Sequence, residues 1–98
     1  MFTNSSEIEP KVLKELIAAG SIASARIEGV QGGLAIILKV GLQDRTLGAA
    51  RGGVRLFQSL DGAASVLQSY GIEKFTVNTS NWVPKTMSRS QQKEAATT

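Results

Sequence analysis

The residues of this chain that could do chemistry are chiefly arginines that stand beside glycines. Arg51, Gly52 and Gly53 form a glycine-rich turn of the kind whose backbone amides can hold a phosphate. Known phosphate loops pass directly into a helix and carry a lysine followed by serine or threonine. Here the apolar segment VRLF follows the glycines instead. The pattern therefore favours a tight turn with positive φ over a phosphate site.

Arg45 and Arg55 lie on either side of this turn. If the segments that carry them pair as a hairpin about residues 51–53, the two side chains could share one face, with Arg51 at the tip. A basic two-stranded ribbon of this kind can enter the major groove of DNA or follow a phosphate backbone. The alternative is three solvated side chains on the open side of a sheet, because no aromatic residue interleaves them as base-stacking sites require.

A second basic pattern lies near the C-terminus. Lys85, Arg89 and Lys93 are spaced by four residues, so on a helix they would form one basic stripe that could lie along phosphates or an acidic partner. The segment around them is polar and lacks apolar partners. This composition favours a disordered, solubilising tail.

The amino-acid composition narrows the catalytic options. The chain has no histidine and no cysteine, which excludes the usual zinc sites and both Ser-His-Asp and Cys-His catalysis. The carboxylates show no spacing typical of acid–base or metal chemistry. We therefore expect no enzyme, no cofactor and no metal.

The net charge of +3 is unevenly distributed along the chain. Residues 1–80 carry eight Lys/Arg against seven Asp/Glu, and residues 81–98 carry three against one. Proteins that bind nucleic acid through phosphates usually concentrate more positive charge than this on one face. The longest apolar run, residues 34–38, is too short to span a bilayer, and the N-terminus lacks the pattern of a secretory signal. We expect a soluble cytoplasmic protein with no membrane partner.

Hydrophobic periodicity predicts the elements that must position these residues. A helix is expected to start at Pro10, which is favourable at a first helical position, and to end at Gly20. Between residues 21 and 57 the period falls to about two, which predicts four antiparallel strands joined by short glycine loops. The strand over residues 34–40 is apolar on nearly both faces, so we place it at the centre of the sheet.

A second helix and a last strand are expected after the fourth strand. Ser59 is a favourable N-cap, and Gly71 is expected to end the helix in a Schellman motif that brings Ile72 onto Leu67. Alternating apolar residues over 75–77 then predict the last strand.

The predicted fold is α+β: an antiparallel sheet of four to five strands with two helices on one face, in the order α-β-β-β-β-α-β. We expect a flexible N-terminus over residues 1–8, a single domain over residues 9–84 and a disordered basic tail over residues 85–98. Trp82 is expected to complete the core, and contact with a partner is the alternative.

Several motifs between residues 32 and 77 resemble those of ParC-like proteins, which are encoded beside the partition genes of plasmids and conjugative elements and are distinct from the topoisomerase subunit of that name. The motifs are a glycine pair before a strand, an R-x-L hairpin with R-G, a V-R-x-F strand, an L-D helix start and a G-I-x-x-F-x-V strand. In this chain they fall on Gly32-Gly33, Arg45 with Leu47 and Arg51-Gly52, Val54-Arg55 with Phe57, Leu60-Asp61 with Leu67, and Gly71-Ile72 with Phe75 and Val77. Leu34 stands where the pattern has an aromatic residue.

The resemblance implies a setting in plasmid maintenance and supplies no catalytic residue. We therefore expect a non-enzymatic accessory protein of plasmid maintenance or partition, which acts by contact with DNA or with a partition protein. The residues expected to make that contact are Arg45, Arg51, Arg55, Lys85, Arg89 and Lys93. The alternative is a homodimeric protein–protein interaction module that binds no nucleic acid and pairs through an exposed sheet edge.

Overall fold

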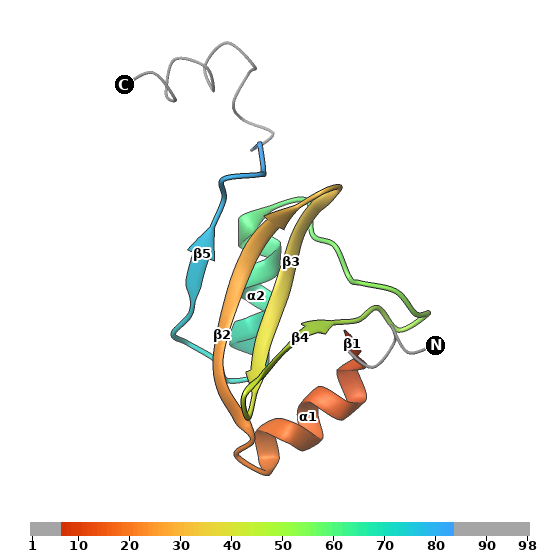
Figure 1. Cartoon of the computed structure of the whole chain (residues 1–98), viewed down its shortest axis with the longest axis vertical. Coiled ribbons are helices and arrows are strands. Elements are labelled where there is room, and N and C mark those ends of the chain that lie inside the picture. The colour runs from red at the N-terminus through yellow and green to blue at the C-terminus, as the bar shows by residue number, and fades with distance from the viewer. Residues whose placement is uncertain (1–6, 84–98) are drawn as a thin grey trace.

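The computed structural model describes residues 7–83, which form one sheet and two helices (Figure 1). The elements in chain order are β1 (Glu7–Ile8), α1 (Pro10–Ala18), β2 (Ile22–Val30), β3 (Gly33–Val40), β4 (Gln43–Leu47), α2 (Leu60–Ser69) and β5 (Thr76–Asn78). The predicted basic tail, with Lys85, Arg89 and Lys93, lies outside the described residues.

The sheet has five strands in the order β1-β4-β3-β2-β5. The three long strands β2, β3 and β4 are antiparallel, whereas β1 pairs with β4, and β5 with β2, in parallel. The α+β class and the central position of β3 are confirmed, but the predicted purely antiparallel sheet is wrong. Each parallel edge strand is only two or three residues long and is connected to the rest of the sheet through a helix, so no hairpin signal in the sequence specifies its direction.

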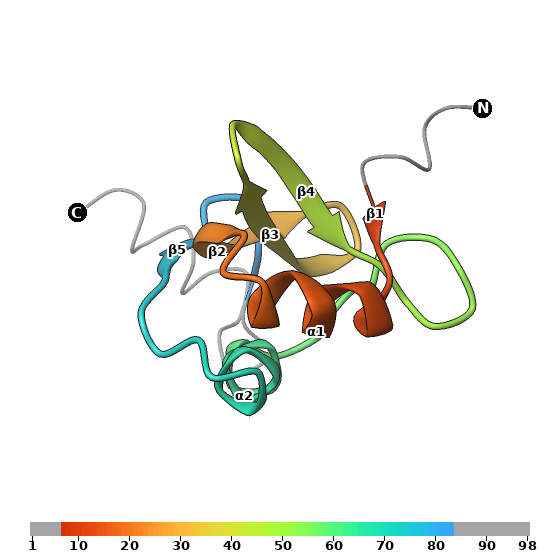
Figure 2. The same cartoon turned by 90° about the horizontal axis from the view of Figure 1, so that it is seen from below.

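Both helices cover the same face of the sheet (Figure 2). From this face α1 buries Leu13 and α2 buries Ala63 and Leu67 against the apolar side of β2 and β3. The fully buried side chains that fill the space between the layers are Ile8, Leu13, Ile27, Leu34, Ile36, Leu38, Leu47 and Leu67. Residues 7–83 place no helix on the opposite face of the sheet, as the one-sided arrangement expected from the sequence requires.

The helix ends follow local sequence signals. The hydroxyl of Ser59 accepts a hydrogen bond of 3.0 Å from the backbone N–H of Gly62, as expected of an N-cap. At the other end of α2, Gly71 has a φ of 83°, and the N–H of Ile72 donates to the carbonyl of Leu67 at 3.0 Å. This is the predicted Schellman motif, which satisfies carbonyls that the helix itself leaves free.

The sheet begins at Glu7, two residues before the predicted start of the domain at residue 9. Glu7 and Ile8, expected in a flexible segment, form β1 beside β4, and the side chain of Ile8 is buried. A single apolar residue between two glutamates is too short a pattern to identify a strand.

Residues 54–57, which were predicted to form a fourth strand, do not form one. This segment makes two isolated bridges, one from Val54 to Gly48 and one from Phe57 to Leu34. It leaves the end of β4 and passes to the start of β3, so it never runs along one neighbour for more than a residue. The element order is therefore β-α-β-β-β-α-β.

Trp82 packs against the core, which confirms the first of its two expected roles. It approaches β2 at Gly29, where an added Cβ would lie 2.7 Å from the Trp82 Cβ and 3.2 Å from the carbonyl carbon of Asn81. Glycine at this position therefore leaves room for the chain that follows β5.

Candidate partner-contact site

The Arg51-Gly52-Gly53 segment is a tight turn, as the sequence predicted. Gly52 and Gly53 have φ angles of 98° and 76°, which are strained for residues with a Cβ. The N–H of Ala49 donates to the carbonyl of Gly53 at 2.8 Å, and the N–H of Gly52 donates to the carbonyl of Ala49 at 3.0 Å. The Gly52 amide is thus already used inside the turn and is not free to bind a phosphate.

The surroundings of this turn are acidic. A cavity of about 220 Å³ beside the turn is lined by Gly52 and Gly53 on one side and by Glu7 and Glu9 on another. Carboxylates at this position would repel a phosphate. The phosphate-loop interpretation therefore has no support in the structure.

Arginine side chains occur in this turn and on both sides of it, and the three lie in different environments. Arg45 pairs with Leu38 in the β3–β4 ladder and so projects from the helix-covered face, where it is half-buried and its Nε has no hydrogen-bond partner among the described residues. The Arg55 guanidinium lies over Phe57, with its Cζ 4.7 Å from the ring centroid, in a cation–π contact. Arg51 is exposed at the turn.

The predicted two-stranded basic ribbon about residues 51–53 is therefore not formed. Its second strand is missing, and Arg45 does not face the open side of the sheet. The sequence already indicated the direction of the Arg45 side chain, because Arg45 and Leu47 are two residues apart on β4 and must share a face. Leu47 is buried in the core, so Arg45 projects from that side as well.

The open face of the sheet carries an ion network that sequence reasoning did not identify. Arg26 on β2 forms a salt bridge with Glu28 on its own strand and donates from Nη2 to Oδ2 of Asp44 on β4 at 3.2 Å. Because β3 lies between β2 and β4, the Arg26 side chain spans the width of β3. The hydrogen bond from Arg26 lowers the pKa of Asp44 below its usual value, and the hydrogen bonds to Asp44 and Glu28 raise the pKa of Arg26.

This network leaves little net charge at the centre of the open face. The basic side chains of Arg26 and Lys39 stand among the acidic side chains of Glu28 and Asp44, and Asp44 pairs with Lys39 in the β3–β4 ladder. A face with equal numbers of the two charges does not attract a polyanion.

A groove lies at the opposite side of the molecule from the arginine-bearing turn, along the edge of β2. β5 pairs with β2 only over residues 26–28 of β2, so residues 22–25 have no strand beside them on this side among the described residues. The connection from α2 to β5 passes on the helix side of the sheet and reaches the β2 edge only where β5 begins (Figure 2). The β2–β3 register shifts between Ile22 and Ser24, so the ladder is irregular at this end of the strand.

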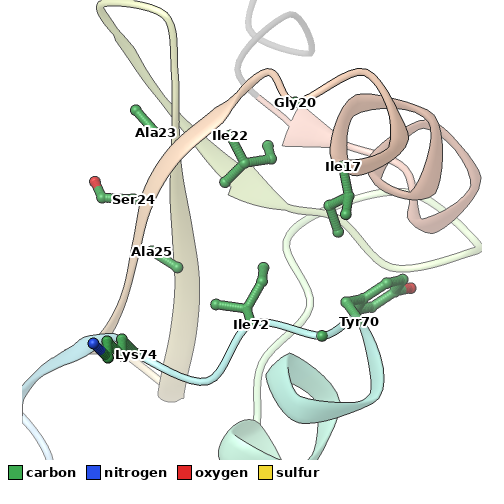
Figure 3. Close-up of a pocket in the computed structure, with 10 residues that line it drawn as sticks. Ile17, Gly20, Ile22, Ala23, Ser24, Ala25, Tyr70, Ile72 and Lys74 are labelled. Atoms are coloured by element: carbon green, nitrogen blue, oxygen red, sulfur yellow. The ribbon is translucent and has the colours of Figure 1, made fainter.

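The floor of this groove is a cavity of about 210 Å³ lined by both apolar and polar groups. Ile17 from α1, Ile22 from β2 and Ile72 from the α2–β5 connection converge on it, and Tyr70 closes one end (Figure 3). The cavity lies where both helices end. The Schellman turn of α2 lies beside it, and at the end of α1 the N–H of Ser21 donates to the carbonyl of Leu16 at 2.9 Å in the same pattern.

A wider, more open cavity of about 500 Å³ continues from this floor toward β5. The two cavities share the residues 23–25 and Lys74, and we call the combined feature the β2 groove. The larger part adds Arg26, Phe75 and Thr76 to its lining. The sequence could not show this groove, because it arises where β5 and β2 diverge and not from any motif.

The charged groups in the lining of the β2 groove are both basic. Arg26 is held by Glu28 and Asp44, whereas the exposed Lys74 takes part in none of the salt bridges of the described residues. No carboxylate lines either part of the groove. Within residues 7–83, the groove therefore combines an unpaired strand edge, a floor with three isoleucines and one ammonium group outside the salt bridges.

Two further properties concern residues 7–83 only. This part of the chain holds no group of three or more histidine, cysteine or acidic side chains placed to bind a metal ion. Neither of its helices has the length and apolar character that crossing a membrane would require.

Comparison with known protein families assigns the chain to one of them. The family model described as ParC-like matches residues 8–86, which is about four-fifths of the sequence. The chain belongs to the ParC-like family, as the motifs between Gly32 and Val77 predicted. No curated protein and no solved structure gives a match.

Proposed function

We propose that this chain is a non-enzymatic, cytoplasmic accessory protein of plasmid maintenance or partition, and that it acts by binding a partner protein. Membership of the ParC-like family supports the setting. The observation that carries the mode of action is the β2 groove, where residues 22–25 have no outer strand among the described residues and lie beside a cavity with three isoleucines in its wall. Free strand edges and apolar pockets are the features by which many domains recognise extended segments of other proteins.

The distribution of titratable groups supports binding over catalysis. Catalytic sites tend to hold buried polar groups with shifted pKa values. Among the described residues, no polar or charged side chain is buried as a whole residue, and the shifted pKa values belong to Arg26 and Asp44 on the open face. These two groups stabilise each other, and Arg26 lines only the wider, more open part of the β2 groove.

Contact with DNA through the arginines has weaker support. Arg45 is half-buried, Arg55 lies over an aromatic ring, and the turn beside Arg51 is flanked by glutamates. Fluorescence anisotropy with plasmid DNA at low salt tests this mode directly. Tight binding that is lost when Arg45, Arg51 and Arg55 are changed to alanine would favour DNA contact over protein contact.

A plasmid-loss experiment tests the proposed function. An in-frame deletion of the gene is compared with the parent replicon over many generations without selection, and the deletion is complemented in trans by the intact gene. We expect faster loss of the plasmid in the deletion strain and restored retention on complementation. Equal loss rates in all three strains would refute a role in plasmid maintenance.

The edge strand β5 favours homodimer formation as a second candidate function. All three of its residues are exposed, and residues 75–81 contain neither a charge nor a proline, although natural edge strands usually carry such residues to prevent pairing. Sedimentation analysis over a wide concentration range measures this directly. A dimer that dissociates on changing Val77 to lysine would support pairing through β5, whereas a monomer at every concentration would rule it out.

A further inference from the structure

We propose that the β2 groove binds an extended segment of a partner protein, which adds a strand to the free edge of β2, places an apolar side chain in the floor cavity and sets a carboxylate against Lys74. This inference rests on the proposed function, because it specifies the partner contact made there. It names the chemistry of the ligand: a short extended peptide with one branched aliphatic or similar apolar residue and a nearby aspartate or glutamate.

The backbone of β2 defines where such a segment would lie. Residues 22–25 pair with β3 on one side but have no strand on the other among the described residues. Four residues of extended chain span roughly 13 Å, since a strand rises about 3.3 Å per residue. β5 begins beside Arg26, so an added strand would continue the line of β5 along the edge of β2. Its backbone groups would pair with polar groups of β2 that otherwise depend on water.

The floor cavity determines the apolar part of the ligand. The floor cavity, of about 210 Å³, has room for a single side chain, and the adjoining part of the groove, of about 500 Å³, has room for the rest of an extended segment. Ala25 projects from the helix-covered face of β2, and a strand residue placed beside it would point the same way, into the space between Ile17, Ile22 and Ile72.

The charge of the groove determines the polar part of the ligand. Lys74 lines both parts of the groove, is exposed, and forms none of the salt bridges found in residues 7–83. The nearby Arg26 adds positive potential even though its guanidinium is held by two carboxylates. An acidic peptide is therefore favoured over a basic one, which Lys74 would repel.

A partner protein fits this groove better than a second copy of the same chain. The described segments that combine an acidic with an apolar residue include Glu7–Ile8, which already pairs with β4 as β1, and Leu42–Asp44, whose carboxylate is already held by Arg26. The edge strand β5 is uncharged, so it offers no carboxylate for Lys74.

Selection from a random peptide library displayed on phage tests the inference. The full chain serves as the target, and the selected peptide is then synthesised and its Kd measured by fluorescence polarisation. We expect a consensus with one apolar and one acidic residue. Changing the apolar residue to serine is expected to weaken binding at least roughly tenfold, and Lys74→Glu is expected to weaken it by a similar factor.

Two controls separate groove binding from general effects of charge or folding. Lys14→Glu on the exposed side of α1 makes the same change in net charge outside the groove and is expected to leave the Kd unchanged. A peptide with its acidic residue replaced by lysine is expected to recover affinity for the Lys74→Glu variant, which shows that this variant remains folded.

Several results would overturn the inference. They are the absence of any consensus, a basic consensus, or binding that is insensitive to Lys74→Glu and to loss of the apolar residue. Competition by plasmid DNA in place of peptide would assign the groove to nucleic acid and would also overturn it. Because a plasmid-loss experiment requires no peptide, failure of the peptide inference and failure of the proposed function are distinguishable.

Discussion

The close approach of Trp82 to β2 leads to a quantitative prediction for the variant Gly29→Ala. The new methyl group would lie 2.7 Å from the Cβ of Trp82 and 3.0 Å from its backbone nitrogen. Two of its nearest neighbours, Trp82 N and the Asn81 carbonyl carbon, are backbone atoms, so no rotation of a side chain can relieve the clash. The segment that follows β5 must move away from the sheet.

The expected change in the free energy of unfolding combines two opposing effects. Overpacking of this kind costs about 1–3 kcal/mol, and replacing glycine by alanine restores about 0.4–1 kcal/mol by restricting the unfolded chain. The free energy of unfolding should therefore fall by about 1–2 kcal/mol. With a denaturant slope near 1 kcal/mol/M, the urea midpoint should fall by roughly 1–2 M.

Urea unfolding of the variant, followed by circular dichroism and by the fluorescence of the single tryptophan, measures the loss of stability and the displacement of Trp82. The emission of Trp82 should shift to the red in the folded variant because its side chain loses contact with the core. Gly62→Ala is a control for the emission: its added Cβ would meet the Ser59 cap hydroxyl at 3.0 Å and no atom of Trp82 within 4 Å, so the emission should stay unchanged. Unchanged stability and emission in Gly29→Ala would refute the packing described for Trp82.

Three further variants test other parts of the structure. Ser59→Ala removes the hydroxyl that caps α2 at the Gly62 amide, and thermal unfolding should show a loss of about 1 kcal/mol, whereas an unchanged midpoint would mean that the cap contributes nothing. Leu67→Ala deletes a fully buried side chain and should cost about 2–5 kcal/mol in urea unfolding; a cost below about 1 kcal/mol would contradict its core position. The hydrogen bond from Arg26 lowers the pKa of Asp44, so the stability it contributes is present above the ordinary pKa and is lost as pH falls through the lowered folded value. Asp44→Asn should therefore flatten the acid end of the stability–pH curve relative to the parent, and identical curves would show that this pair does not contribute.

Local signals in the sequence predicted the helices and the central hairpin well. The Pro10 start, the Ser59 cap and the glycines after both helices each act through the few residues around them, so no tertiary information is needed. The turn before Gly33 and the central, doubly apolar strand β3 follow from the same kind of local pattern.

Features that depend on distant contacts were not predictable in this way. The parallel direction of β5 is decided by how α2 crosses under the sheet, and the pairing of Glu7–Ile8 depends on the position of β4. The predicted basic ribbon required residues 54–57 to pair along β4, but these residues cross to β3. The β2 groove depends on the divergence of two strands that are about fifty residues apart in the sequence.

Amide hydrogen exchange of the full chain, with and without a saturating concentration of the selected peptide, tests the central claim most directly. If the partner segment adds a strand to β2, the peptide should slow exchange at amides within residues 22–25 that face the groove, because these groups become hydrogen-bonded. Amides of the Arg51 turn should exchange at the same rate in both states. Protection confined to the Arg51 turn or to β5, with residues 22–25 unchanged, would contradict the account.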